Sequence, residues 1–298
     1  MRNMTSRDYE GEKDFQAILD LTASVRPVQH RNDYPGQVDL EEAFATVIVP
    51  KNTRLWFDEG YLAAWAYVDG YNNLIWELNA QYTGQLGAEI VEWGEECVRR
   101  NLSSVEKGAL YANCRDSYME RIAFLKGHGF DQLKDTTITL TRQLSGALPD
   151  PLLPAGFIIR PILGKQEADA VAAMHRAAFG TDYMTTENRL IIMSTSGYDP
   201  SLDLVVIAPD GSIAANCICS VNLQDRIGFT DPVSAHPRFQ GMGLVRALLL
   251  TGLRLLKERG MTHARLGTSG DNIRMQRSAE AVGFKVEYKT LWFSKEVN

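Results

Sequence analysis

The chain has 298 residues, 45% of them hydrophobic and 23% charged, which suits two globular domains of about 150 residues each. Its formal net charge of −6 argues against nucleic acid or an anionic membrane as a partner and favours a cationic small molecule. No run of 18 apolar residues occurs, the first residues are polar, and the four cysteines lack metal-ligand spacing. We therefore expect a cytoplasmic protein without a metal, either monomeric or homodimeric.

The first half of the chain predicts strands and helices that end near residue 144. Asp58–Ala64 is typical of a hairpin turn that enters a strand, and a helix is predicted over 87–100. Phe124–Phe130 ends in a Gly-Phe pair. Three prolines and two glycines then predict an extended linker over 145–156.

The second half predicts a similar order of elements. Strands are expected at 157–161, 204–208, 213–221, 228–235, 263–267, 285–288 and 291–294, and helices at 166–178, 186–194, 244–259 and 272–282. Neighbouring antiparallel strands, combined with helices that connect other strands, predict an α+β fold, a layered variety of α/β architecture.

The two halves resemble each other weakly. Three glycine-centred matches recur in one order at a nearly constant offset: Gly60 with Gly211 (151 residues), Gly129 with Gly283 (154) and Gly84 with Gly241 (157). This regularity predicts two copies of one fold.

The most informative segment lies between the strand-like Val233–Ala235 and a leucine-rich helix that begins near residue 244. Its residues 240–243 contain two glycines, no acid occupies the first turn of the helix, and Arg238 and Arg246 flank it. Such a helix start presents backbone N–H groups and a positive dipole end, which predicts an anion site. A plain tight connection between strand and helix would contain the same glycines, and this alternative stays open.

Two motifs in this half resemble a known family. Gln240–Val245 resembles the pattern [Q/R]xxGx[G/A], the acyl-CoA-binding segment of the GCN5-related N-acetyltransferases (GNAT). Asn272–Phe284 resembles the family's second signature, NxxAxxLYxxxGF, with the same spacing from Asn to Gly-Phe. The resemblance covers residues 156–298.

The resemblance implies two tandem GNAT-like domains. Residues 1–144 would form a degenerate structural copy, 145–156 the linker, and 157–298 the catalytic copy that binds acetyl-CoA. Each copy would have a mixed, mostly antiparallel sheet flanked by helices, in which two parallel strands splay to admit the pantetheine arm. In the second copy these strands would be 228–235 and 263–267.

The implied activity is transfer of an acetyl group from acetyl-CoA to the primary amine of a small molecule, by direct attack in a ternary complex. Backbone N–H groups of 241–245 would hold the pyrophosphate, and the edge of Val233–Ala235 would pair with pantetheine and offer an oxyanion hole. Asn272 would contact the pantetheine arm or cap the helix that follows it. The implied cosubstrate-binding residues are Val233, Ser234, Ala235, Gln240, Gly241, Met242, Gly243, Leu244, Val245 and Asn272.

Four residues are candidates for proton transfer. Asp231 lies two residues before Val233 and is the first choice of base, with a turn-forming role beside Pro232 as its alternative. His236 is the second choice, against a role in structuring the loop before Pro237. Ala279 stands where many family members carry the tyrosine that protonates the leaving thiolate, so Ser278, Tyr288 or water would replace it.

The first copy departs from the family pattern. Thr83 and Leu86 stand where the second copy has Gln240 and Gly243, and Tyr118 stands where it has Asn272. Glu89 is expected in the first turn of its helix, where it would occupy the positive end. We therefore expect this copy to be structural and to bind no CoA.

Two other readings remain open: a non-catalytic module that binds or senses acetyl-CoA, and a tandem scaffold or interaction protein. The acceptor amine is also open among an aminoglycoside-like polyamine, an amino-acid-derived amine and a thiol-precursor amine. The acceptor pocket is expected near 183–189.

Overall fold

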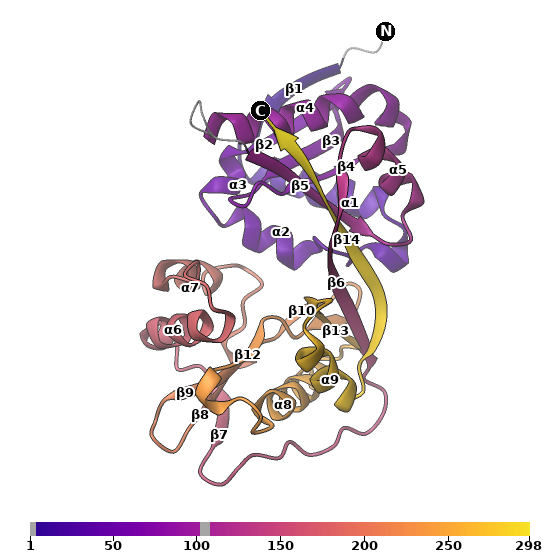
Figure 1. The fold of residues 1–298 in the computed structure, drawn as a ribbon. Helices are drawn as coiled ribbons and strands as arrows, with labels where there is room; N and C mark the ends of the chain where they lie inside the picture. The colour runs from indigo at the N-terminus through magenta and orange to yellow at the C-terminus, as the bar shows by residue number, and fades with distance from the viewer. Residues whose placement is uncertain (1–3, 102–107) are drawn as a thin grey trace. The chain divides into compact units, whose positions relative to one another are not determined.

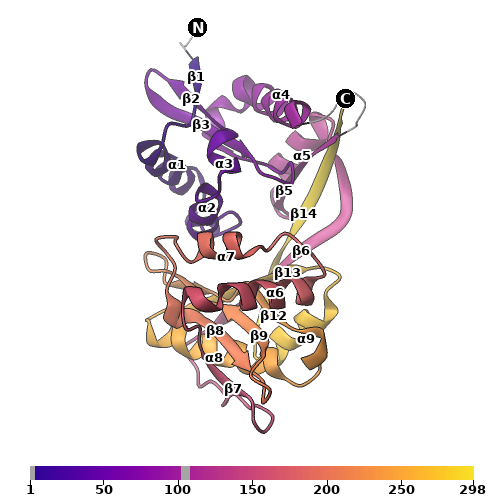
Figure 2. The same cartoon turned by 90° about the vertical axis from the view of Figure 1, so that its left-hand side faces the viewer.

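A computed structural model describes residues 4–101 and 108–298, in which the chain divides into two compact units (Figures 1 and 2). Unit 1 consists of Met1–Thr136 together with Thr290–Asn298, and unit 2 of Thr137–Lys289. Both units contain antiparallel sheets with helices packed on them, so the predicted α+β class and tandem arrangement are confirmed.

Unit 1 contains an antiparallel sheet in the order β1-β2-β3-β4. Its strands are β1 (Met4–Asp8), β2 (Thr53–Asp58), β3 (Tyr61–Val68), β4 (Leu74–Leu78) and, outside this sheet, β5 (Gly108–Arg115). Its helices are α1 (Glu12–Val25), α2 (Gln37–Phe44), α3 (Ile48–Lys51), α4 (Thr83–Asn101) and α5 (Met119–Gly127), with 3-10 turns at Val28–His30 and Ala80–Tyr82.

Successive side chains of β3 point to opposite faces of the sheet, and both faces are buried. Ala64 and Ala66 belong to the core that contains the buried face of α4, whereas Trp65 and Tyr67 belong to the core that contains Ile18 of α1. The sheet is therefore covered by helices on both faces.

Unit 2 contains an antiparallel sheet in the order β12-β9-β8-β7. The strands of this sheet are β7 (Ile158–Pro161), β8 (Asp203–Ile207), β9 (Ile213–Ile218) and β12 (Val233–Ala235). Unit 2 also contains β10 (Ser220–Asn222), β11 (Ile227–Phe229) and β13 (His263–Ser269), outside this sheet. Its helices are α6 (Ala168–Phe179), α7 (Thr186–Ile192), α8 (Leu244–Glu258) and α9 (Ile273–Ala281), with 3-10 turns at Lys165–Glu167, Pro200–Leu202 and Pro237–Phe239.

Helix α8 lies at the centre of the core of unit 2. Leu248 and Leu253 are fully buried and belong to one cluster with Leu204 of β8, while Val205 faces the opposite way and packs with Val171 of α6. Each such leucine stabilises the fold by about 1.5–3 kcal/mol. This packing fixes the position of the first turn of α8 and thereby of the loop before it (Figure 2).

Cys217 and Cys219 lie on one face of the sheet, as their alternation predicts. Both are buried in the α8 core with their sulfurs 3.8 Å apart. The hydrogen bond between them and their burial raise the pKa of the Cys217 thiol. They are small core residues, and no group of three or more potential metal ligands occurs among the described residues.

Two long strands, β6 (Asp131–Gln143) and β14 (Lys285–Val297), supply residues to both units (Figure 1). Residues 137–143 of β6 pair with β13 in unit 2, and residues 290–297 of β14 pair with β5 in unit 1. The limits of the compact units therefore differ from the expected domain limits, since the linker 145–156 lies within unit 2 and the last nine residues belong to unit 1.

Several predicted elements differ from those observed. The helix expected from residue 87 already begins at Thr83, because Thr83–Leu86 contains no residue that must adopt a non-helical conformation. The strand expected over 213–221 is two strands, β9 and β10, and the strand expected over 228–235 is also two, β11 and β12. The two expected terminal strands are one, β14.

Candidate functional site

Two parallel strands of unit 2 separate at one end, as expected. β11 and β13 pair in parallel from Ile227 to Phe229, opposite His263 to Arg265. Beyond this point the chain enters β12, which pairs instead with β9. Among the described strands, β12 is the last in its sheet, so its other edge retains backbone groups that an extended ligand can pair with.

Asp231 lies where the two strands separate. Its exposed carboxylate accepts a hydrogen bond of 2.7 Å from the backbone N–H of Gly267 in β13. The side chain thus bridges the two diverging strands and lies two residues before β12. A carboxylate in this position can accept a proton at the inner end of the gap.

The three residues of β12 have different environments. Val233 packs in the α8 core, and Ala235 packs partly against it. Ser234 faces α6 and donates a hydrogen bond of 2.8 Å to Asn216. The side chains of β12 are therefore committed to packing, and its backbone is the part suited to a ligand.

The loop before α8 has the geometry of an anion site. Gly241 and Gly243 adopt φ values of 81° and 80°, in the left-handed region that favours glycine, and open space lies where a Cβ would project from either. Met242 between them is exposed, whereas Leu244 is buried and Val245 packs partly on the core. The first turn of α8 contains no acid, so its N–H groups and positive dipole end are available to a phosphate.

Gln240 connects this loop to its surroundings. Its side-chain amide nitrogen lies 3.4 Å from the carbonyl oxygen of Ala235, and its amide oxygen accepts a hydrogen bond from Arg274 of α9. Asn272 caps α9 by accepting a hydrogen bond of 3.1 Å from the N–H of Met275. The capping role expected for Asn272 is therefore confirmed.

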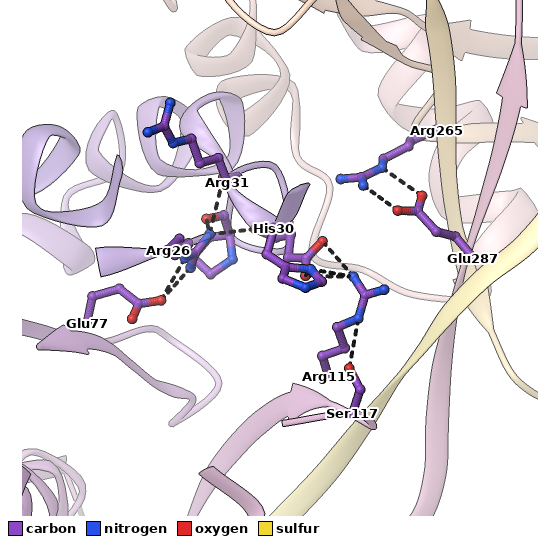
Figure 3. A network of polar contacts seen from close by, with 10 residues as sticks. Arg26, His30, Arg31, Glu77, Arg115, Ser117, Arg265 and Glu287 are labelled. Atoms are coloured by element: carbon purple, nitrogen blue, oxygen red, sulfur yellow. Dashed lines mark hydrogen bonds and ion pairs between the residues drawn. The ribbon is translucent and has the colours of Figure 1, made fainter. Parts of the chain in front are cut away.

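The other proposed catalytic residues each have local contacts of their own. His236 accepts a hydrogen bond of 3.1 Å from the N–H of Arg238, which is the loop-structuring alternative. Tyr288 is buried on β14, next to Glu287. Glu287 pairs with Arg265 (Figure 3). Because neighbours in a strand face opposite sides, Tyr288 lies on the other face of β14 from this ion pair. Ala279 is fully buried in the α8 core.

The region expected to shape the acceptor pocket is partly structural. Arg189 is buried and donates to the fully buried Asp203, which also accepts a hydrogen bond of 2.6 Å from Tyr198. Tyr183, by contrast, is 45% exposed. Of these residues, Arg189 therefore has a structural role.

Unit 1 has a different structure at the corresponding loop. Helix α4 begins at Thr83, so the positions that match the glycine loop are already helical, and Leu86 is buried. The expectation that Glu89 lies in the first turn is wrong, because six residues of helix precede it. Its carboxylate instead accepts a hydrogen bond of 2.7 Å from Trp56.

Charged side chains line a cavity of about 520 Å³ in unit 1, near the start of α4. Glu77 pairs with Arg26 at 2.7 Å (Figure 3). It also pairs with Arg121, at 3.5 Å. Burial by itself raises the pKa of Glu77, but the two arginines outweigh it and hold the pKa below its ordinary value. Nearby, Arg115 donates to Asp33 at 2.9 Å.

The loop with two left-handed glycines, the acid-free start of α8 and the two separating parallel strands occur together in unit 2. Residues 168–284 match the model of the acetyltransferase (GNAT) family. The matched segment lies within unit 2.

Solved structures of the family have a similar fold over the whole chain. A GCN5-related N-acetyltransferase from Sphaerobacter thermophilus has a TM-score of 0.74 at 21% identity, covering 99% of this chain and 96% of that chain. A tandem GNAT protein from the clavulanic acid biosynthesis pathway has a TM-score of 0.72 at 14% identity, covering 100% and 99%.

Curated relatives match over a shorter range. A mycothiol acetyltransferase from Kineococcus radiotolerans is 33% identical over 142 residues, which is 46% of this chain and 45% of the relative. One from Arthrobacter sp. is 30% identical over 133 residues, covering 42% and 41%. The match thus spans about half the length of these relatives.

Among the described residues, no helix is long and apolar enough to cross a membrane.

Proposed function

We propose that the chain is an N-acetyltransferase that transfers the acetyl group of acetyl-CoA to a primary amine of a small molecule. The observation that carries this proposal is the loop with two left-handed glycines, followed by an acid-free helix start beside two separating strands. Unit 2 contains this arrangement, and the proposed catalytic domain is therefore unit 2.

The loop and β12 would hold the cosubstrate through their backbones. The N–H groups from Gly241 to Val245 would bind the pyrophosphate, and the free edge of Val233–Ala235 would pair with pantetheine as an added strand. An N–H of this strand would stabilise the oxyanion that forms as the amine attacks the thioester carbonyl. Open space at Gly243 supports close approach of a phosphate.

Asp231 would accept the proton of the attacking amine. The nitrogen lone pair forms the new C–N bond, the C–S bond breaks, and the electron pair leaves with the sulfur. The hydrogen bond from Gly267 orients the carboxylate at the inner end of the gap between the strands. Because Ala279 carries no proton donor, Ser278, Tyr288 or water would protonate the leaving thiolate.

Unit 1 would have a structural role and bind no acetyl-CoA. Its continuous helix from Thr83 leaves no glycine loop, and its Glu77 is held by two arginines.

Mycothiol acetyltransferases are the relatives that guide the choice of acceptor. An amine of the mycothiol type is the first acceptor to test, followed by polyamines and amino-acid-derived amines. The alternative function is a module that binds acetyl-CoA without turnover, which the buried Ala279 at the position of the family tyrosine favours.

A calorimetric titration with acetyl-CoA tests the proposal on wild type, Gly243→Glu and Gly211→Glu. Gly211 also has a left-handed φ, of 82°, and open space at its Cβ, but it lies in the turn before β9, so it is a matched control. We expect Gly243→Glu to weaken binding by about ten-fold or more, because a carboxylate competes with the pyrophosphate, and Gly211→Glu to bind as wild type does. Absence of binding in the wild type would reject the proposal.

Release of free CoA thiol in the presence of each amine then separates the two functions. Turnover identifies an acetyltransferase. Binding without turnover across all three acceptor classes favours the binding module.

A further inference from the structure

The cavity of unit 1 lies where the end of β4, the start of α4 and the first turn of α5 meet. Its volume of about 520 Å³ is in the range of small-molecule sites. Residues 76–78 line it, and they correspond to Val233–Ala235 of unit 2 at the offset of 157 residues that also relates Gly84 to Gly241. The cavity therefore matches the position of the proposed cosubstrate gap in unit 2, but its lining is different.

Two of its charged residues neutralise each other. The side chains of Arg26 and Glu77 are largely buried and pair at 2.7 Å (Figure 3). The other terminal nitrogen of Arg26, Nη1, donates to the backbone carbonyl oxygens of Asp33 and Pro35 at 2.7 Å and 2.8 Å. This pair therefore stabilises the fold and leaves no net charge for a ligand.

Arg121 is held in place but retains unused donors. Its Nη2 donates to the backbone carbonyl oxygen of Trp76 at 2.8 Å, and its guanidinium lies over the Trp76 ring, 4.2 Å from the centroid. The contact with Glu77, at 3.5 Å, is too long for a strong hydrogen bond. Among the described residues, none accepts a hydrogen bond from Nε or Nη1 of Arg121. The cavity therefore contains one fixed guanidinium with available N–H groups.

A second donor lines the same cavity. The ring of Tyr118 packs edge-on against His30, and within the described part of the chain its hydroxyl has no hydrogen-bond partner. Glu120 also lines the cavity but is exposed, so water and salt screen its charge. The partly buried side chains that remain available, Arg121 and Tyr118, thus offer donors and one positive charge, which suits an anion.

The apolar part of the lining suits an organic anion. It includes Val25, Leu78, Met119 and Phe124. Met119 is 69% exposed at the first position of α5, and its flexible thioether side chain adapts to different apolar shapes. A single guanidinium balances a carboxylate, whereas a phosphate monoester carries a charge of about −1.5 to −2 at pH 7.

We propose that this cavity binds a monocarboxylate with an apolar or aromatic body. Arg121 and Tyr118 donate to the carboxylate, and the body lies against Phe124 and Met119. This site goes beyond the proposed function and does not depend on it, because it assigns a different ligand to the cavity of unit 1.

A ligand-observed NMR titration of the full chain with 1-naphthylacetate and 1-naphthylacetamide tests this assignment. The two probes have almost the same shape, and only the first carries a charge. We expect the wild type to prefer 1-naphthylacetate by about ten-fold or more, because its hydrogen bonds are charge-assisted. Saturation with acetyl-CoA should leave this binding unchanged. Displacement of the acid by acetyl-CoA would instead place the acid in the cosubstrate site and overturn the assignment.

Two variants locate the acid in the cavity. Arg121→Gln should weaken binding of 1-naphthylacetate by about ten-fold or more and leave binding of the amide unchanged. Tyr118→Phe keeps the ring beside His30, removes only the hydroxyl, and should weaken binding of the acid by about three-fold or more. Arg54→Gln is the matched control, since it removes the same charge from an arginine that lies outside the cavity and pairs with Asp8 at 3.2 Å. It should bind both probes as the wild type does.

Three results would overturn the assignment. One is equal affinity of the wild type for the two probes, or no binding of the acid at about 10 mM. Another is equal weakening of the acid in Arg54→Gln and Arg121→Gln, which would show a general effect of charge. If near-UV circular dichroism shows that Arg121→Gln does not fold, Tyr118→Phe decides, and wild-type affinity of that variant for the acid is the third. Each of these results leaves the proposed function intact, because acetyl-CoA binding is measured separately.

Discussion

Arg160 of β7 donates two hydrogen bonds to the carboxylate of Glu167, at 2.9 Å and 2.6 Å. The same carboxylate accepts the backbone N–H of Leu163 at 2.7 Å. The arginine lies in the first strand of unit 2 and the acid in the turn that leads into α6, so this contact fixes the entry of the chain into that helix.

Unit 1 contains the same arrangement. Arg7 of β1 donates two hydrogen bonds to Asp14, at 2.6 Å and 2.7 Å, and Asp14 accepts the N–H of Glu10 at 2.8 Å. A constant spacing of 153 residues separates the three members of this contact from their counterparts in unit 2. Two copies of one fold have kept the chemistry of the contact while the length of the acid changed.

Replacing Glu167 by Gln should produce a pH-dependent loss of stability. The hydrogen bond from Arg160 holds the pKa of Glu167 below its ordinary value. A lowered folded-state pKa stabilises the fold above the unfolded pKa, which is about 4.3, and this contribution disappears as the pH falls through the folded value. The difference in urea midpoint between wild type and Glu167→Gln should be present at pH 7 and shrink below about pH 4.

The corresponding variant in unit 1, Asp14→Asn, should behave in the same way, since the hydrogen bond from Arg7 also lowers the pKa of Asp14. A stability difference that stays constant from pH 7 to pH 3 would contradict this account.

Replacing Arg189 by Ala should destabilise the fold strongly. Asp203 is fully buried, and the variant leaves its carboxylate without the guanidinium that neutralises it. Loss of one partner of a buried pair costs about 3–5 kcal/mol. Urea unfolding measures this, with Arg238→Ala as the control: its ion pair with Asp210 is exposed, so the loss should stay within about 1 kcal/mol. Similar losses in both variants would refute the structural role of Arg189.

The local features of the candidate site could be predicted from sequence because they depend on neighbouring residues. The left-handed glycines, the acid-free first turn and the cap at Asn272 each need only a few consecutive residues. The separation of the two parallel strands followed from the resemblance to the family, and the observed pairing confirms it.

Features that depend on distant pairing could not be predicted. The β6 and β14 residues that complete the two units pair with strands far away in sequence, and nothing in their own composition specifies those partners. The arginine–acid contact is not visible as a repeat in the sequence, because the acid is Asp14 in the first half and Glu167 in the second. The sequence places Arg274 as a basic residue in a first helical turn without acids. It does not show the contact with Gln240, which lies 34 residues away.

The chain should bind one equivalent of acetyl-CoA. In unit 1 the positions that match the glycine loop are helical from Thr83 onward, and Leu86 is buried where unit 2 has Gly243. Calorimetric stoichiometry measures this, and Gly243→Glu should weaken all of the binding by about ten-fold or more, leaving no second site with the affinity of the wild type. A stoichiometry of two would show that unit 1 also holds the cosubstrate.

Replacing Asp231 by Asn should reduce kcat by about 100-fold or more while acetyl-CoA still binds. The amide oxygen of Asn can still accept the hydrogen bond from Gly267, so the separation of the strands is retained, but the side chain can no longer take up a proton. Initial rates of CoA release over a range of pH, together with calorimetry, measure both properties. Asp225→Asn is the control, since Asp225 lies in the turn between β10 and β11 and bonds to Asn222. If Asp231→Asn kept full activity with the same pH profile, His236 would become the preferred base, and His236→Gln would then have to show the loss.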